Sequence, residues 1–206
     1  VAPPFRYRLR VRYGECDAQQ VVFNARYGDY ADAAMIEYQR AVWGATTGPG
    51  AVDMQLVRQV KEWQAPARFD DVLEVRVTTA AIGTTSFTIR CEFRRWPTDD
   101  AVATCETVYV AIGADGRKRP LTAPERAAMR ESRAVEVVDR LDADRDGRLS
   151  VAEFVDGRPG GRRPPPIDRL DADGDGFITT DELIAARPPR GDRGPRGADD
   201  DAGAPR

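Results

Sequence analysis

The sequence predicts an α+β domain, in which one long helix packs on an antiparallel sheet, followed by a small all-α unit. Two observations predict this division. In the first 122 residues, one strand pattern is followed by a long helical pattern and then by four strand patterns. Beyond residue 122, helical segments alternate with two acidic loops of the same spacing, at 142–153 and 171–182.

The elements of the first part follow from the spacing of apolar residues. Residues 6–13 (RYRLRVRY) alternate apolar and arginine side chains, which predicts a half-buried strand. Over 27–41, tyrosines and alanines recur at steps of three and four, which predicts a helix with its tyrosines in the core. Asn24 is expected as the N-cap and Gly44 as the end of this helix. Strands are expected near 55–64 and at 72–82, 86–93 and 103–112.

The second part has a different character. Residues 123–141 are helical in pattern and lead into the first acidic loop. The final residues, 188–206, are Pro, Gly, Arg and Asp with few apolar anchors, which predicts disorder. We therefore expect three units, at 1–122, 123–187 and 188–206.

Composition excludes several classes of function. The 206 residues carry a net charge of −3 and no histidine. Without histidine there is no Ser-His-Asp or Cys-His site and no His-containing zinc motif. The charge gives no sign of nucleic-acid binding, and no apolar run is long enough to span a membrane. The three cysteines are an odd number, and the opening residues lack a signal-peptide pattern, so we expect a cytoplasmic protein.

The two acidic loops have the spacing D-x-D-x-D-G with Glu at position twelve, and they repeat 29 residues apart. Calcium prefers six to eight oxygen ligands, and this spacing fits the EF-hand loop. The predicted ligands of two Ca²⁺ sites are Asp142, Asp144, Asp146, the Arg148 carbonyl and Glu153, then Asp171, Asp173, Asp175, the Phe177 carbonyl and Glu182. The alternatives are a solvated acidic linker or a dockerin-like calcium loop. No organic cofactor is expected.

The net charge of the segment that contains the acidic loops predicts how the metal-free form behaves. Residues 123–187 hold 11 basic and 15 acidic groups, a net of −4. Two Ca²⁺ would neutralise this excess, so the metal-free form is expected to be loosened by self-repulsion. Short helices and a Pro- and Gly-rich link between the loops favour a structural staple over a sensor that opens a groove.

The stretch RVRYGECDAQQVVFNARYGDYADAAMIEYQRA resembles the hotdog-fold acyl-CoA thioesterases of the 4-hydroxybenzoyl-CoA thioesterase type. Asp17, Val22, Phe23 and Tyr27 fall on the motif that joins the first strand of that family to its central helix. The resemblance covers about residues 5–122 and implies a hotdog fold, a helix wrapped by an antiparallel sheet. One position departs from the motif, because Gln20 stands where the family has glycine.

The resemblance implies a catalytic role for Asp17, which would either attack the thioester carbonyl or activate a water. Backbone amides of Phe23 and Asn24 at the helix start would then polarise that carbonyl. The alternative is that Asp17 only caps a turn, with Glu37 as a reserve carboxylate. The resemblance implies, more weakly, that the pantetheine arm of the substrate contacts Thr84, Thr85 and Ser86. The CoA phosphates could bind to Arg117, Lys118 and Arg119. The alternative for these three basic residues is a solvated charge run.

The sequence thus predicts a hydrolase that cleaves acyl-CoA to a free acid and CoA. The family implies a homodimer or homotetramer with sites at the subunit interface. The alternative is a non-catalytic calcium-binding protein that uses the hotdog for oligomerisation or ligand binding. A hotdog dehydratase or hydratase is disfavoured, because such enzymes use a histidine together with Asp or Glu, and this chain has no histidine.

Overall fold

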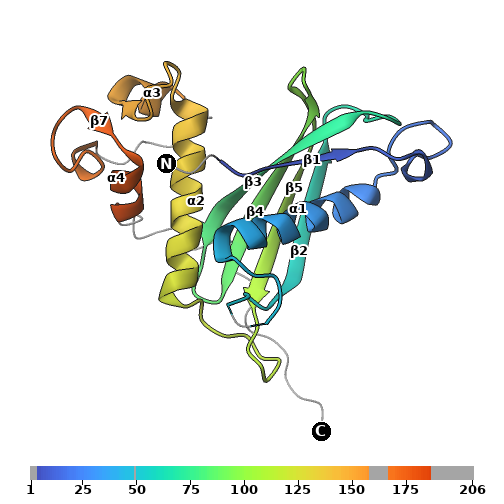
Figure 1. Ribbon diagram of the computed structural model, residues 1–206, viewed down its shortest axis with the longest axis horizontal. Coiled ribbons are helices and arrows are strands. Elements are labelled where there is room, and N and C mark those ends of the chain that lie inside the picture. The colour runs from blue at the N-terminus through green and yellow to red at the C-terminus, as the bar shows by residue number, and fades with distance from the viewer. Residues whose placement is uncertain (1–3, 49, 158–166, 187–206) are drawn as a thin grey trace, which may run out of the picture.

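A computed structural model of the chain describes residues 4–48, 50–157 and 167–186. It has the predicted order of one strand, a long helix, four strands and a helical unit (Figure 1). The predicted disordered tail at 188–206 lies outside the described residues. Among the described residues, no helix combines the length and apolar character needed to cross a membrane.

Five antiparallel strands form one sheet in the order β1-β3-β4-β5-β2. Their bounds are β1 Arg6–Arg10, β2 Met54–Trp63, β3 Val72–Ile82, β4 Ser86–Trp96 and β5 Asp100–Ala111. Alternate residues of β3 and β4, Leu73, Val75 and Val77 with Phe87, Ile89, Cys91 and Phe93, are at most 2% exposed. The period-two pattern of the sequence therefore fixes which face of the sheet enters the core.

Helix α1, Arg26–Trp43, crosses this inner face and contacts β1, β3 and β5 (Figure 1). Tyr27, Tyr30, Ala34 and Tyr38 on one side of the helix are all buried, as the spacing predicts. Small alanines between the tyrosines let the sheet approach the helix closely. Gly44 ends the helix with a φ of 74°, a left-handed conformation that glycine adopts without steric cost.

Two boundaries differ from the predictions. The first strand ends at Arg10 instead of continuing to 13, because the chain turns into a short 3-10 helix, η1, at Tyr13–Glu15. Asn24 does not cap α1; the N-cap is Ala25, and no side chain accepts a hydrogen bond there. The chain enters α1 through turn bonds instead, from the Arg26 amide to the Phe23 carbonyl at 2.9 Å.

Helix α2, Ala123–Leu141, links the sheet to the acidic loops. Thr122 caps its start, and the Thr122 and Glu125 side chains form a reciprocal capping box. Met129, which is fully buried, belongs to the sheet's hydrophobic cluster, whereas Leu141 belongs to a second cluster around the loops. The predicted unit boundary at 122 thus falls at the start of a helix that both clusters share.

The second cluster is small. It is built by α2, α3 at Val151–Asp156, η2 at Ile167–Arg169 and α4 at Thr180–Ala185, with the two-residue strands β6 at Leu149–Ser150 and β7 at Phe177–Ile178. Leu149 pairs with Ile178 across the two strands, and both side chains are fully buried. This pairing joins the two acidic loops through a short strand contact.

Candidate functional site

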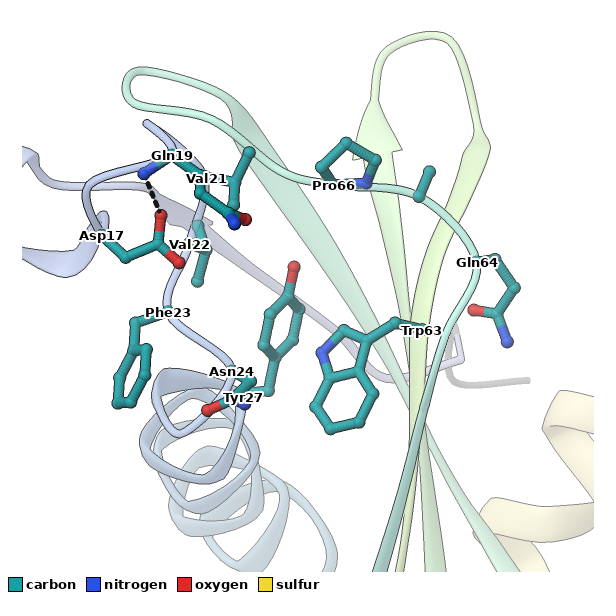
Figure 2. A pocket seen from close by; sticks show the side chains of 11 residues that line it. Asp17, Gln19, Val21, Val22, Phe23, Asn24, Tyr27, Trp63, Gln64 and Pro66 are labelled. Atoms are coloured by element: carbon teal, nitrogen blue, oxygen red, sulfur yellow. Dashed lines mark hydrogen bonds between the residues drawn. The ribbon is translucent and has the colours of Figure 1, made fainter.

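A cavity of about 420 Å³ opens where the chain turns from β1 into α1. Its lining comes from the turn, from the first helical turn and from the end of β2: Asp17, Gln19, Val21, Val22, Phe23, Asn24, Tyr27, Trp63, Gln64, Ala65 and Pro66. Figure 2 shows Asp17 on one side of this cavity and Trp63 on the other, with Tyr27 between them. The structure therefore gathers the three predicted catalytic positions, Asp17, Phe23 and Asn24, at one cavity.

Asp17 is held by a tight turn. Its backbone amide donates to the Val21 carbonyl at 2.9 Å, and its carbonyl accepts from the Gln20 amide at 2.9 Å. One carboxylate oxygen, Oδ1, accepts from the Gln19 amide at 2.8 Å (Figure 2). The residue is half-buried, and its second oxygen, Oδ2, accepts no hydrogen bond from the described part of the chain. The carboxylate is oriented by the turn and still has an oxygen available to a ligand.

Gln20 explains how the turn forms without the family's glycine. Its φ is 61°, in the left-handed region that favours glycine. A non-glycine residue there costs about 1 kcal/mol. The loop thus keeps the backbone shape that glycine would give, and the departure from the motif leaves Asp17 at the cavity.

Backbone amides at the start of α1 differ in their availability. The Phe23 amide donates to the Glu15 carbonyl at 2.9 Å, so it is already engaged. The amides of Asn24 and Ala25 make no hydrogen bond to any described residue. Because a helix N-terminus carries unpaired N–H groups and the positive end of its dipole, these two amides are the donors that a developing oxyanion would meet.

Aromatic side chains form the opposite wall. Trp63, 49% exposed, meets the buried ring of Tyr27 edge-on with 6.0 Å between ring centroids. Tyr27 also meets Phe93 at 5.4 Å, which anchors the wall to the core. Burial raises the pKa of the Tyr27 hydroxyl, so this group stays neutral at physiological pH. The cavity is therefore apolar on one side and carries a carboxylate on the other.

Two further reactive side chains stand apart from this chemistry. Glu37, the reserve carboxylate, forms an ion pair with Arg40 on the exposed surface of α1. Cys16 is half-buried beside Asp17 and is a free thiol. Sequence reasoning missed Glu15, Tyr30 and Trp63 as parts of the site. Glu15 and Tyr30 carried no motif that distinguished them, although an acid two residues before Asp17 was a signal.

The predicted substrate-binding residues gather at the other end of the sheet. The Thr85 carbonyl accepts from the Ala111 amide at 2.8 Å, and Ile112 bridges to Lys118, so 84–86 and 117–119 lie together. Arg119 is bound by Glu125 through two hydrogen bonds of 2.9 and 2.6 Å. β4 runs from Ser86 to Trp96, roughly 35 Å, before it reaches the Asp17 end. Within one chain, these residues and Asp17 do not form a single site.

The acidic loops bring their aspartates together. In each loop, three carboxylates offer ligand atoms that all lie within 4.8 Å of one another: Asp142, Asp144 and Asp146 in the first, Asp171, Asp173 and Asp175 in the second. The Gly147 amide donates to Asp142 at 2.8 Å, and the Gly176 amide donates to Asp171 at 3.0 Å. The glycines have φ values of 88° and 85° and make the sharp turn that the spacing predicts.

Glutamate at position twelve closes each loop. Glu153 accepts from the Ala143 amide at 2.8 Å and Glu182 from the Ala172 amide at 2.7 Å, so each spans its loop. Both also bond the residue that caps the following helix, Ser150 or Thr179. Hydrogen bonds from these groups lower the pKa of both glutamates, which keeps them ionised. An all-oxygen donor set with four carboxylates fits a hard divalent cation.

The loops differ in charge at positions four and seven, among other differences. Position four is Arg145 in the first loop, with φ 62°, and Gly174 in the second, with φ 75°. Position seven is Arg148 in the first loop, whose Nε donates to Asp146 at 3.0 Å, and Phe177 in the second. The Arg148 guanidinium also lies 3.8 Å from the centre of the Phe177 ring. The first loop therefore carries two positive charges beside its carboxylates that the second lacks.

Comparison with known proteins assigns the first part of the chain. The sequence pattern of the thioesterase-like superfamily matches residues 11–144. The chain belongs to this superfamily. The EF-hand pattern matches residues 138–156 and 167–185, which contain both acidic loops. The predicted hotdog fold and the EF-hand pair are thereby confirmed.

Individual relatives agree with the family. A candidate esterase from Aquifex aeolicus (strain VF5) is 29% identical over 112 residues, covering 53% of this chain and 85% of the relative. A Thermus thermophilus thioesterase complexed with coenzyme A and Zn superposes with a TM-score of 0.56 at 24% identity, covering 63% of this chain and 99% of that one. A 1,4-dihydroxy-2-naphthoyl-CoA thioesterase from Synechocystis gives 0.54 at 22%, covering 61% and 94%. At these identities the two structures show a shared fold.

Proposed function

We propose that the protein hydrolyses an acyl-CoA thioester to a free acid and CoA, and that its EF-hand pair binds two Ca²⁺. The observation that carries the first proposal is the cavity that is lined by both the Asp17 carboxylate and the start of α1, where the Asn24 amide makes no hydrogen bond to any described residue. Thioester hydrolysis needs a nucleophile or base and a donor for the oxyanion, and this cavity offers both. It does so without histidine.

The chemistry of the site assigns a role to each part. The substrate carbonyl oxygen would rest on the Asn24 and Ala25 amides, and the acyl group would lie against Tyr27 and Trp63. Asp17 either takes a proton from a water that attacks the carbonyl carbon or attacks that carbon itself. In the first route the carbon–sulfur bond breaks, and Asp17 passes the proton taken from the water to the leaving thiolate, which departs as CoA. In the second route the carbon–sulfur bond breaks as Asp17 forms a mixed anhydride with the acyl group. Water then cleaves this anhydride to the free acid, which restores the Asp17 carboxylate and supplies the proton of the CoA thiol. The family and the superposed thioesterase with bound coenzyme A support this substrate class.

The edge of the sheet supports a homodimer. Among the described strands, β2 has a neighbour on one side only, and it exposes Leu56 at 46% and Val57 at 58%. Such an edge, apolar and unpaired, is a template for pairing with a second strand. Two-fold symmetry makes that pairing antiparallel, so the Trp63 end of one β2 lies beside the Met54 end of its partner. This geometry carries residues 84–86 and 117–119 of one chain toward the Asp17 cavity of the other.

Calcium binding rests on the donor set. Asp142 and Asp171 begin the two loops, position-twelve glutamates close them, and the backbone carbonyls of Arg148 and Phe177 stand at position seven. When bound, Ca²⁺ supplies the positive charge that the clustered carboxylates lack. Free cysteines and a CoA-linked substrate support a cytoplasmic location for this activity.

The first experiment measures CoA thiol release from a panel of aryl-, short- and long-chain acyl-CoAs, each in Ca²⁺ and in chelator. Turnover of any member supports the enzyme and narrows the acyl group. No release from the whole panel would favour the non-catalytic binding protein. Calcium calorimetry tests the loops separately, and two binding events are expected.

A mixing experiment tests the shared site. Asp17→Asn chains are expected to be inactive, and Arg117→Ala chains to be impaired in substrate binding. In a mixed dimer, one site combines an intact Asp17 with an intact Arg117. Adding the inactive Asp17→Asn chain should therefore raise the activity of the Arg117→Ala chain. If mixing and reassembly leave the rate unchanged, the residues do not meet across the interface.

A further inference from the structure

A buried acidic residue, Glu15, contacts two residues of the segment that carries the cavity, Phe23 and Tyr30. Glu15 is 7% exposed and lies two residues before Asp17 in the chain. It accepts hydrogen bonds from the Tyr30 hydroxyl at 2.7 Å and from the Arg12 amide at 2.7 Å. The Arg12 guanidinium adds a third bond at 2.8 Å. Burial opposes the charged form, but these bonds outweigh it and lower the pKa of Glu15.

The contacts of Glu15 join three segments of the site. Tyr30 belongs to the buried face of α1, and Arg12 is the N-cap of η1, two residues after the end of β1. The backbone carbonyl of Glu15 accepts a hydrogen bond from the Phe23 amide at 2.9 Å, which ties Glu15 to the chain just before the Asn24 and Ala25 amides. Burial and the Glu15 carboxylate raise the pKa of Tyr30, so its hydroxyl remains a donor.

We propose that Glu15 is a positioning residue, which with Tyr30 sets the Asp17 turn against the start of α1. Loss of this anchor would let the carboxylate and the oxyanion donors separate, and small displacements of reacting groups cost large factors in rate. The proposal rests on the proposed role of Asp17. Glu15 itself touches neither substrate nor cavity in this assignment.

The test uses two matched tyrosines on α1. Tyr30→Phe removes the hydroxyl that anchors Glu15, whereas Tyr38→Phe removes an equally buried hydroxyl that bonds Thr79 and Ser132 away from the cavity. Both should lower the melting temperature by a similar amount. Only Tyr30→Phe should lower kcat, by about tenfold or more, with KM nearly unchanged. Glu15→Gln should behave like Tyr30→Phe.

The outcomes separate the two proposals. Equal kcat values for the two tyrosine variants would overturn the positioning role, even if the wild-type enzyme and its Asp17 dependence were established. An inactive wild-type protein would overturn the proposed function instead, and the positioning role with it. A fall in kcat confined to Tyr30→Phe supports both.

A second inference rests on helix α2. This helix is about 28 Å long and runs from the sheet to the first acidic loop. Met129 is buried in the sheet's cluster, and Val138 and Leu141 are buried in the loop cluster. The next residue, Asp142, is both the C-cap of α2 and the first carboxylate of the loop. A metal held by Asp142 would therefore fix the last turn of α2.

Two ion pairs tie that last part of α2 to the sheet. On β1, Arg6 donates to Glu136 at 2.6 Å and to Asp139 at 2.8 Å. Glu136 is 7% exposed, so this contact is shielded from solvent. Asp139 lies three residues before the loop's first ligand. Figure 1 shows α2 standing between the sheet and the loop unit. The loop thus connects to β1 through one helix turn and one arginine.

We infer that Ca²⁺ in the first loop stabilises the hotdog sheet through α2 and Arg6. A ligand that binds only the folded loop stabilises every part that unfolds with it. This rests on the proposed calcium binding. It concerns the stability of the sheet and requires no change in the catalytic step.

The chain supplies its own probe for the test. All three tryptophans, Trp43, Trp63 and Trp96, precede residue 122, so tryptophan fluorescence follows unfolding of the hotdog part together with the start of α2, which Trp43 contacts. Thermal unfolding in Ca²⁺ should give a fluorescence midpoint roughly 4 °C or more above that in chelator. Arg6→Gln should reduce this shift to less than half. Arg10→Gln is the matched control, because its exposed pair with Asp70 is remote from α2.

Calorimetry distinguishes the possible failures. If Ca²⁺ binds but the tryptophan midpoint does not move, the coupling is overturned while calcium binding stands. If Arg6→Gln and Arg10→Gln keep the same shift, the route through Arg6 is overturned. If calorimetry detects no Ca²⁺ binding, both the metal site and the coupling fall.

Discussion

Asp17 and the aspartates of the acidic loops carry the same carboxylate in opposite settings. Asp17 is single and half-buried, and it lines one cavity with the start of a long helix. The loop aspartates stand in threes and are largely exposed. A lone carboxylate beside an apolar wall can act on a carbonyl, because no other charge competes for it. Clustered carboxylates repel one another and call for a cation.

The largest expected effect comes from neutralising the single carboxylate. Asp17→Asn should lower kcat/KM by between about a hundredfold and ten-thousandfold, because the amide is neither base nor nucleophile. Its oxygen can still accept from the Gln19 amide, so the turn should be kept. Steady-state kinetics measure the loss, and an unchanged circular dichroism spectrum is the control. A variant with wild-type turnover would leave Asp17 as a turn cap only.

Neutralising a loop carboxylate should have a smaller and separate effect. Glu182→Gln should weaken Ca²⁺ binding to the second loop by roughly tenfold or more, since the site loses one charge and a bidentate ligand. Glutamine can still serve in the capping box with Thr179, so α4 should remain folded. Calorimetry measures the affinity, with Glu153→Gln as the counterpart in the first loop. Thioester hydrolysis at saturating Ca²⁺ is expected to be unaffected.

The two loops can also be compared with each other. Arg145→Gly should strengthen Ca²⁺ binding to the first loop by about threefold to tenfold, because a positive charge near the carboxylates is removed. Gly174→Arg should weaken the second loop by a similar factor. The Ca²⁺ affinity of each variant loop is measured in a protein whose other loop is weakened by the Glu→Gln change at position twelve. If neither substitution changes the Ca²⁺ affinity of its loop, an arginine at position four does not affect the bound metal.

The smallest effect concerns the turn itself. Gln20→Gly relieves about 1 kcal/mol of left-handed strain, which the extra freedom of glycine in the unfolded chain largely offsets. The melting temperature should rise by a few degrees at most. Gln19→Gly relieves no strain and only adds conformational freedom to the unfolded chain, so it should lower the melting temperature. If both changes destabilise the protein equally, Gln20 is not strained.

The sequence alone determined the elements and the acidic loops. Apolar periodicity placed α1 and the four later strands, because side-chain burial follows local spacing. The loop ligands were readable because they lie within twelve consecutive residues, so their geometry depends on the local backbone. Asp17 was found through a motif in which the acid and the helix start are close in sequence.

Only the tertiary structure decided which groups meet. Glu15 is bound by Tyr30 and Arg12, and Trp63 faces Tyr27, through contacts between separate elements that no local spacing encodes. The same holds for Arg6 and its partners on α2, which are 130 residues or more apart in the chain. Occupancy of the Phe23 amide by the Glu15 carbonyl also depends on how the turn folds back. Long-range packing chooses these pairs, because burial leaves each polar group only the partners that the fold brings within reach.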